Sequence, residues 1–190
     1  MRAGMLGGLA LAMAACSANY VEDSQASVIL VVTAINEGAP ITSDVRSETD
    51  DGGSTIVNCN ADVSVILLPK NPGAVGIGPS EAVVISRYEV TYARTDSRGA
   101  EGVDVPFRIV GPVSLTVPPN GTATFPITIV RHQAKFEPPL VNIDGASLMT
   151  MAAQITLYGE TISREGVTAS GSVQVTFGDF AEGSETCETE

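Results

Sequence analysis

The sequence has no tryptophan and one histidine among its 190 residues, with five phenylalanines and four tyrosines. So few aromatic rings argue against a carbohydrate-binding platform, which needs exposed aromatic faces. The histidine, His132, lies beside Arg131 in a polar segment, and we expect it in an exposed loop. No serine lies in a G-x-S-x-G nucleophile elbow, so nothing points to a hydrolytic triad. The sequence therefore predicts a protein that is not an enzyme and has no cofactor.

Basic residues are also scarce. The sequence has ten lysines and arginines and 22 acidic residues, which gives a net charge of −12. Nucleic-acid binding needs clustered lysines and arginines to neutralise phosphates, so the charge balance excludes nucleic-acid binding as the expected function. The apolar fraction of 44% is too high for a disordered chain. The length suits one folded domain.

The N-terminus is built like an export signal. Arg2 precedes an apolar run from Met5 to Met13, and the small residues Ala14 and Ala15 follow. The run is too short to span a bilayer as a helix, which takes about 20 residues. We expect residues 1–15 to be a cleaved signal peptide.

The residues Met13-Ala14-Ala15-Cys16 resemble a bacterial lipobox. The resemblance implies that Cys16 carries diacylglycerol and palmitate and becomes the first mature residue. Ser17 replaces the aspartate that retains lipoproteins at the inner membrane, which implies an outer-membrane lipoprotein held by its lipid. Ala12-Met13-Ala14 also fits an A-x-A cleavage site, and that alternative gives a secreted soluble protein.

The other cysteines, Cys59 and Cys187, form an even pair if Cys16 is acylated. In an exported, oxidising compartment they are candidates for a disulfide, and two unpaired thiols are the alternative. We expect residues 16–26 to form a polar tether, 27–180 the folded domain and 181–190 an acidic flexible tail.

Apolar residues between these ends recur mostly with a period of two, which is typical of β-strands. One face of 83–95 is expected to carry Val84, Ser86, Tyr88, Val90 and Tyr92, and Pro126 predicts an edge strand or a bulge. A helix is the alternative for 148–158, and 37–61 is expected to be a loop with at most a short strand near 54–57. Seven to eight strands are expected, at 28–36, 62–68, 83–95, 103–110, 113–117, 123–129, 148–158 and 166–179.

This pattern predicts an all-β fold, a single antiparallel β-sandwich. The strand order and the closing pair 148–158 and 166–179 resemble bacterial immunoglobulin-like domains, and a jelly roll or small barrel is the alternative. Together with ARTDSRGAEGVDVPF (93–107) and ASGSVQVTFGDF (169–180), the N-terminus resembles uncharacterised bacterial lipoproteins of this type. The resemblance brings no known activity.

Two surfaces are candidate sites. Arg94, Asp96 and Arg98 lie at a hairpin tip and are candidates for contact with a partner protein. Simple pairing of the outward charges with Glu89, Glu101 and Asp104 is the alternative. An acidic loop supplies oxygen atoms suited to calcium, through Asp44, Glu48, Asp50 and Asp51.

We therefore expect a non-enzymatic envelope protein that contacts other envelope proteins or copies of itself. A calcium- or glycan-binding extracellular domain that uses loop 44–51 is the alternative.

Overall fold

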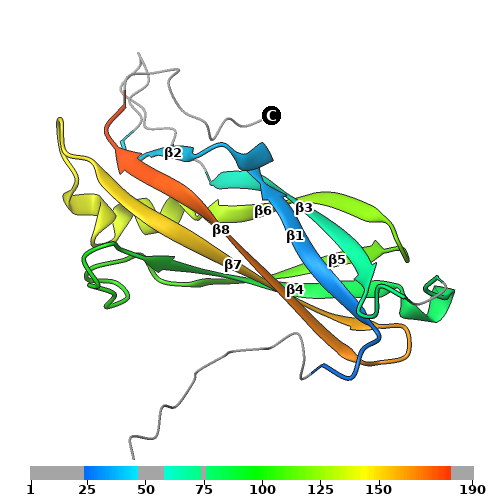
Figure 1. The fold of residues 1–190 in the computed structure, drawn as a ribbon. Helices are drawn as coiled ribbons and strands as arrows, with labels where there is room; N and C mark the ends of the chain where they lie inside the picture. The colour runs from blue at the N-terminus through cyan, green and yellow to red at the C-terminus, as the bar shows by residue number, and fades with distance from the viewer. Residues whose placement is uncertain (1–23, 47–57, 74–75, 181–190) are drawn as a thin grey trace, which may run out of the picture.

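The computed structural model describes residues 24–46, 58–73 and 76–180, and in these ranges the chain is all-β (Figure 1). The strands are β1 (Val28–Ile35), β2 (Ile41–Asp44), β3 (Cys59–Pro69), β4 (Val83–Ala93), β5 (Ile109–Val117), β6 (Thr122–Val130), β7 (Met149–Thr161) and β8 (Gly166–Gly178). Short 3₁₀ turns join some of them: η1 (Asn36–Gly38), η2 (Pro79–Glu81), η3 (His132–Phe136) and η4 (Leu140–Asn142).

The strands form two sheets that share one apolar core. The first has the order β1-β3-β6, and the second has the order β2-β8-β7-β4-β5. Neighbouring strands are antiparallel, except that β2 runs parallel to β8. The expectation of a fully antiparallel fold is therefore wrong at this one pair.

Strict alternation decides which side chains enter the core. In β7 the odd-numbered residues Met151, Ala153, Ile155 and Leu157 are buried, while the even-numbered residues between them are exposed or half-buried. This confirms a strand over 148–158 and excludes the helical alternative there. His132 is exposed, as expected.

The prolines Pro112 and Pro126 lie in β5 and β6, the two edge strands on one side of the molecule. Because proline has no N–H for the hydrogen-bond ladder, it is tolerated at sheet edges. The edge position expected for the Pro126 strand is confirmed.

Three local expectations are wrong. Ile41–Asp44 forms β2 inside the segment expected to be a loop, because four residues are enough to pair with the end of β8. Residues 102–104 form a turn, 106–108 have no regular structure, and the returning strand begins only at Ile109. A bulge between Ile85 and Arg87 turns Val84 and Ser86 outward, whereas Tyr88, Val90 and Tyr92 face the core as expected.

The strands separate two ends of the molecule. The tether end comprises residues 24–27, Lys70 and the β7–β8 turn 162–165, since the Ser24 hydroxyl donates to the Gly166 carbonyl and Lys70 Nζ to the Ser24 carbonyl. The hairpin end comprises the β4–β5 connection 94–108. Figure 1 shows the blue start of β1 beside the orange β7–β8 turn, and the green connection at the far side.

Register fixes this separation. Val83 pairs with Thr161 near the tether end, and Ala93 pairs with Ala152 near the hairpin end. The 11 residues of β4 therefore span about 35 Å between the two ends.

Several predicted features lie outside the described residues: the signal peptide, Cys16, Glu48, Asp50, Asp51, the tail 181–190 and Cys187. Ser24–Ala26, the last residues of the expected tether, contact the folded domain, and Ala26 is buried. No helix in the described part of the chain is long and apolar enough to cross a membrane.

Candidate functional site

The tip of the β4–β5 connection is organised around one carboxylate. Arg94 donates from Nε and Nη2 to the two oxygens of Asp96, at 3.0 and 2.8 Å. Arg98 reaches the same carboxylate from the other side, with Nε and Nη2 each 2.9 Å from Oδ2. The structure therefore brings together all three residues that the sequence nominated at this tip.

These contacts shift both kinds of group away from their ordinary pKa values. The hydrogen bonds from Arg94, reinforced by those from Arg98, hold the pKa of Asp96 far below its usual range. The same contact with Asp96 raises the pKa of Arg94. The carboxylate is charged at every physiological pH, and the two arginines are bound to it.

The base of the connection is a tight turn around Ala100. Its carbonyl accepts backbone N–H groups from Val103, Asp104 and Val105, and its own N–H donates to Asp104 Oδ2 at 3.2 Å. Gly102 has a φ of +73°, and a Cβ there would come within 2.3 Å of the Phe107 ring. Glycine is favoured at this position, because the backbone angle strains other residues and a side chain would have to displace the ring.

A second row of charges joins the connection to the outer face of the five-stranded sheet. Arg108 Nε donates to Glu101 at 2.9 Å, and Nη1 lies 3.4 Å from Glu89. The Tyr158 hydroxyl on β7 donates to the other oxygen of Glu89 at 3.1 Å. With the 3.9 Å contact between Arg98 and Asp104, the pairings considered for Glu89, Glu101 and Asp104 are all present.

Three large apolar side chains are exposed in and beside this charged connection. Val103 is 68% exposed, Val110 is 53% exposed and Phe107 is 47% exposed. Sequence reasoning missed them because it placed 103–110 in a strand, where alternate apolar residues would face the core. The prolines at 106 and 112 were the available signal against a regular strand through this region.

The expected calcium ligand Asp44 is not part of a solvated loop. It lies in β2 with 2% of its surface exposed, and Oδ1 accepts the backbone N–H groups of Arg46 at 2.9 Å and Phe180 at 3.4 Å. Its Oδ2 has no hydrogen-bond partner among the described residues. The described residues contain no group of three or more His, Cys, Asp or Glu side chains placed to hold a metal ion.

Cys59 opens β3 and is fully buried. It takes part in a disulfide whose partner lies outside the described residues. Pairing with Cys187 therefore stays a prediction.

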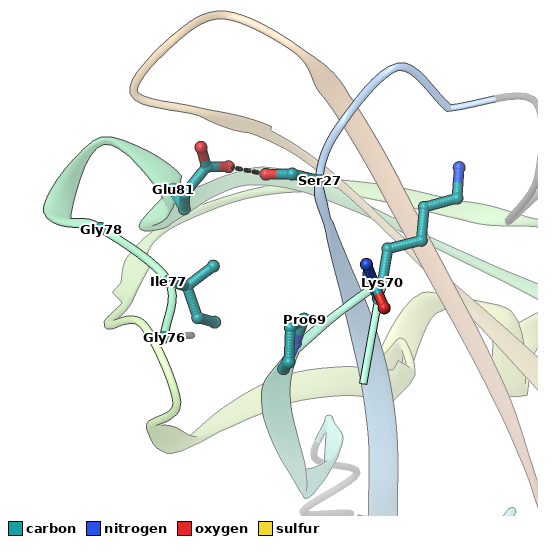
Figure 2. Close-up of a pocket in the computed structure, with 8 residues that line it drawn as sticks. Ser27, Pro69, Lys70, Gly76, Ile77, Gly78 and Glu81 are labelled. Atoms are coloured by element: carbon teal, nitrogen blue, oxygen red, sulfur yellow. Dashed lines mark hydrogen bonds between the residues drawn. The ribbon is translucent and has the colours of Figure 1, made fainter. Parts of the chain in front are cut away.

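A hollow of about 340 Å³ lies at the tether end (Figure 2). Ile77 and Pro69 supply apolar walls, and the Ser27 hydroxyl donates to Glu81 across its rim. Figure 2 shows the Ser27 and Glu81 side chains pointing toward one another, while Lys70 extends away from Ile77. The Ser27 hydroxyl is thus paired with Glu81, and Lys70 Nζ donates to the Ser24 carbonyl outside the lining.

No family model matches this sequence, and no curated protein does. Similar solved structures include an X-ray structure described as Northeast Structural Genomics Consortium target SoR45. It is 11% identical, with 86% of this chain and 94% of that chain covered and a TM-score of 0.38. Another is Pseudomonas fluorescens alkylpurine DNA glycosylase AlkC bound to DNA containing an abasic site analog. It is 11% identical, with 79% and 30% of the two chains covered and a TM-score of 0.31. Likeness this distant carries no argument about function.

Proposed function

We propose that this chain is a lipid-anchored protein of the bacterial outer membrane that contacts other envelope proteins through its hairpin end and is not an enzyme. The anchor rests on the lipobox-like residues Met13–Cys16 and on the apolar run before them. Two or more acyl chains give stable membrane attachment, whereas a single chain binds reversibly.

The observation that carries the contact proposal is the exposure of Val103 and Phe107 on a loop held by internal ion pairs, with Val110 exposed beside it at the start of β5. Protein interfaces combine an apolar centre with a polar rim in which arginine is enriched. Because Arg94, Arg98 and Arg108 are already paired, the loop is pre-organised and loses little conformational entropy on binding. A free basic patch would instead predict a polyanionic partner.

The direction of the tether supports the same assignment. The chain enters the folded domain at Ser24, about 35 Å along β4 from the connection 94–108. A lipid on Cys16 would therefore hold the tether end toward the membrane and the hairpin end away from it. Loops presented by a rigid scaffold are where binding residues concentrate.

For the fold we propose an immunoglobulin-like β-sandwich. The order β8-β7-β4-β5 matches the G, F, C and C′ strands of variable-type domains, and β1-β3-β6 matches strands A, B and E. The N-terminal segment also passes from one sheet to the other between β1 and β2. Sandwich corners are made by strands that switch sheets in this way.

Site-specific photo-crosslinking in cells tests the contact. A benzoylphenylalanine at position 107 should give a discrete adduct, and the matched probe at Ile162, 59% exposed at the tether end, should give none. The adduct mass distinguishes a second copy of this chain from another envelope protein. Absence of adducts at 107, or the same adducts at 162, would overturn the assignment.

The anchor has its own test. Cys16→Ser should move the protein from the membrane fraction to the soluble fraction, and the wild-type N-terminal peptide should carry the mass of the acyl chains. A mature chain that still begins at Met1 contradicts the anchor but not the contact surface. Cleavage at the A-x-A site, with an unmodified Cys16, supports the secreted alternative.

Calcium binding is the second candidate, and one observation favours it. Oδ2 of Asp44 is buried and has no hydrogen-bond partner among the described residues, and an ion is one way to satisfy such an atom. A calorimetric calcium titration of wild type and Asp44→Asn decides the point. No heat with wild type removes this candidate.

A further inference from the structure

The bulge in β4 places two consecutive side chains on the outer face of the five-stranded sheet. Ile85 pairs with Gly159 and Arg87 pairs with Tyr158, so Ser86 has no partner on β7. Ser86 and Arg87 are both exposed, whereas Ile85 and Tyr88 on either side of them are buried. Bulges re-aim side chains in this way and are over-represented next to functional sites.

Arg87 is held by the ring of Tyr158. Its guanidinium carbon lies 3.9 Å from the centre of the Tyr158 ring, a close cation–π stack. Among the described residues the guanidinium forms no ion pair and donates no hydrogen bond. At the hairpin end, by contrast, Arg94, Arg98 and Arg108 each bind a carboxylate. Arg87 binds none among the described residues.

The stacked pair lines a hollow of about 320 Å³ on this face, which we call the bulge site: Ser86, Arg87, Tyr158, Glu160, Gly166 and Thr168. Three neighbouring strands build it, because Arg87 pairs with Tyr158 and Tyr158 pairs with Thr168. Gly166 lines it without a side chain, and a Cβ added there would meet nothing within 4 Å. The volume lies at the lower end of the range for small-molecule sites.

The groups of the bulge site select a chemical class. A guanidinium fork binds a carboxylate through two parallel hydrogen bonds. The hydroxyls of Ser86 and Thr168 can each donate and accept, and the Glu160 carboxylate accepts hydrogen bonds from ligand hydroxyls. Glu160 also disfavours a dianion such as phosphate, and the net charge of −12 disfavours a polyanion.

We propose that the bulge site binds a single uronic acid unit of a largely neutral polysaccharide. The carboxylate of the sugar meets Arg87, and the ring hydroxyls meet Ser86, Thr168 and Glu160. This site lies on the sheet face and goes beyond the protein contacts proposed for the hairpin end. It also differs from the glycan alternative expected at loop 44–51.

The test compares methyl β-glucuronide with methyl β-glucoside, which differ only in carboxylate against hydroxymethyl. Titration of the ¹⁵N-labelled mature protein, followed by NMR, should show saturable shifts of the Arg87 Nε–H and of the amides at 86, 158 and 168 with the glucuronide alone. Acetate should bind about tenfold more weakly in the same titration, because it lacks the hydroxyls.

Two variants sharpen the result. Arg87→Lys keeps the charge but loses the fork, and Gly166→Leu fills the hollow without touching Arg87. Each should weaken glucuronide binding about tenfold or more, whereas Arg164→Ala in the nearby turn should leave it unchanged. Thermal unfolding of each variant checks that the fold is intact.

Equal binding of glucoside and glucuronide would overturn the role of Arg87. Acetate binding as tightly as the glucuronide would reduce the hollow to an ion site and overturn the saccharide assignment. No saturable shift with any of the three probes would overturn the proposal as a whole.

Discussion

The hairpin end and the tether end differ in the kind of contact that orders them. At the tether end, polar side chains bond to backbone carbonyls, as Ser24 does with Gly166 and Lys70 does with Ser24. At the hairpin end, charged side chains bond to each other, as Arg94 and Arg98 do with Asp96. At the tether end these bonds link Ser24 to the start of β8 and to Lys70, which follows β3. The contacts at the hairpin end order a long connection in which Val103 and Phe107 stay exposed.

This difference predicts how the two ends respond to pH and salt. Contacts between a side chain and a backbone carbonyl involve no carboxylate, so acid does not remove them. Contacts between charged side chains order a loop without burying it, so they respond to pH and salt. The following changes should separate the two ends, in order of decreasing effect.

Gly102→Ala should have the largest effect. A positive φ costs an L-residue about 1–2 kcal/mol, and the new Cβ must also displace the Phe107 ring. We expect the free energy of unfolding to fall by about 2 kcal/mol or more, with added exposure of Phe107. At the tether end, Gly166→Ala meets open space and should change stability by less than about 0.5 kcal/mol. Denaturant unfolding of both variants measures the contrast, and equal losses would contradict it.

Tyr92→Phe should have an intermediate effect. The buried Tyr92 hydroxyl donates to the Ile129 carbonyl and so joins β4 of one sheet to β6 of the other near the hairpin end. Loss of this hydrogen bond should cost about 1 kcal/mol at neutral pH.

Burial also raises the pKa of Tyr92 above its ordinary value of 10.0. The unfolded chain therefore loses this proton first as pH rises, and the stability that depends on the protonated form declines above about pH 10. The alkaline decline should be smaller in the phenylalanine variant than in wild type. Urea unfolding of both proteins between pH 8 and 11 measures it, and parallel curves would show that Tyr92 does not contribute.

Asp96→Asn should change the free energy of unfolding the least of the three, and its effect should be confined to residues 94–108. The pKa of Asp96 is depressed, so its stabilising contacts are fully present above the ordinary value of 3.8 and are lost as pH falls toward the folded-state value. Hydrogen exchange in 94–108 should therefore accelerate between about pH 4 and pH 2 in wild type, after correction for intrinsic rates. The asparagine variant should show fast exchange there already at neutral pH.

Residues 24–26 serve as the control for this acid loosening, because their side-chain hydrogen bonds within the described residues run between Ser24, Lys70 and backbone groups and involve no carboxylate. Exchange that rises equally at both ends would indicate global acid unfolding and would contradict the local account.

Much of the fold followed from local pattern. Alternation of apolar residues is a property of consecutive residues, so it predicted the strand and the buried face of β7, and the missing N–H of Pro126 predicted an edge. The arginines and acids of 89–108 are close in sequence, so their pairing was also foreseeable. The composition by itself established an acidic chain with a net charge of −12.

Tertiary structure decided the features that need a distant partner. The four residues of β2 form a strand only because the end of β8 offers a parallel edge, and the bulge beside Ser86 appears only in the register with β5 and β7. The same is true of the stack of Arg87 on Tyr158 and of the separation of the two ends. A period of two specifies a face, but it does not specify which neighbour that face meets, since register is set across the sheet.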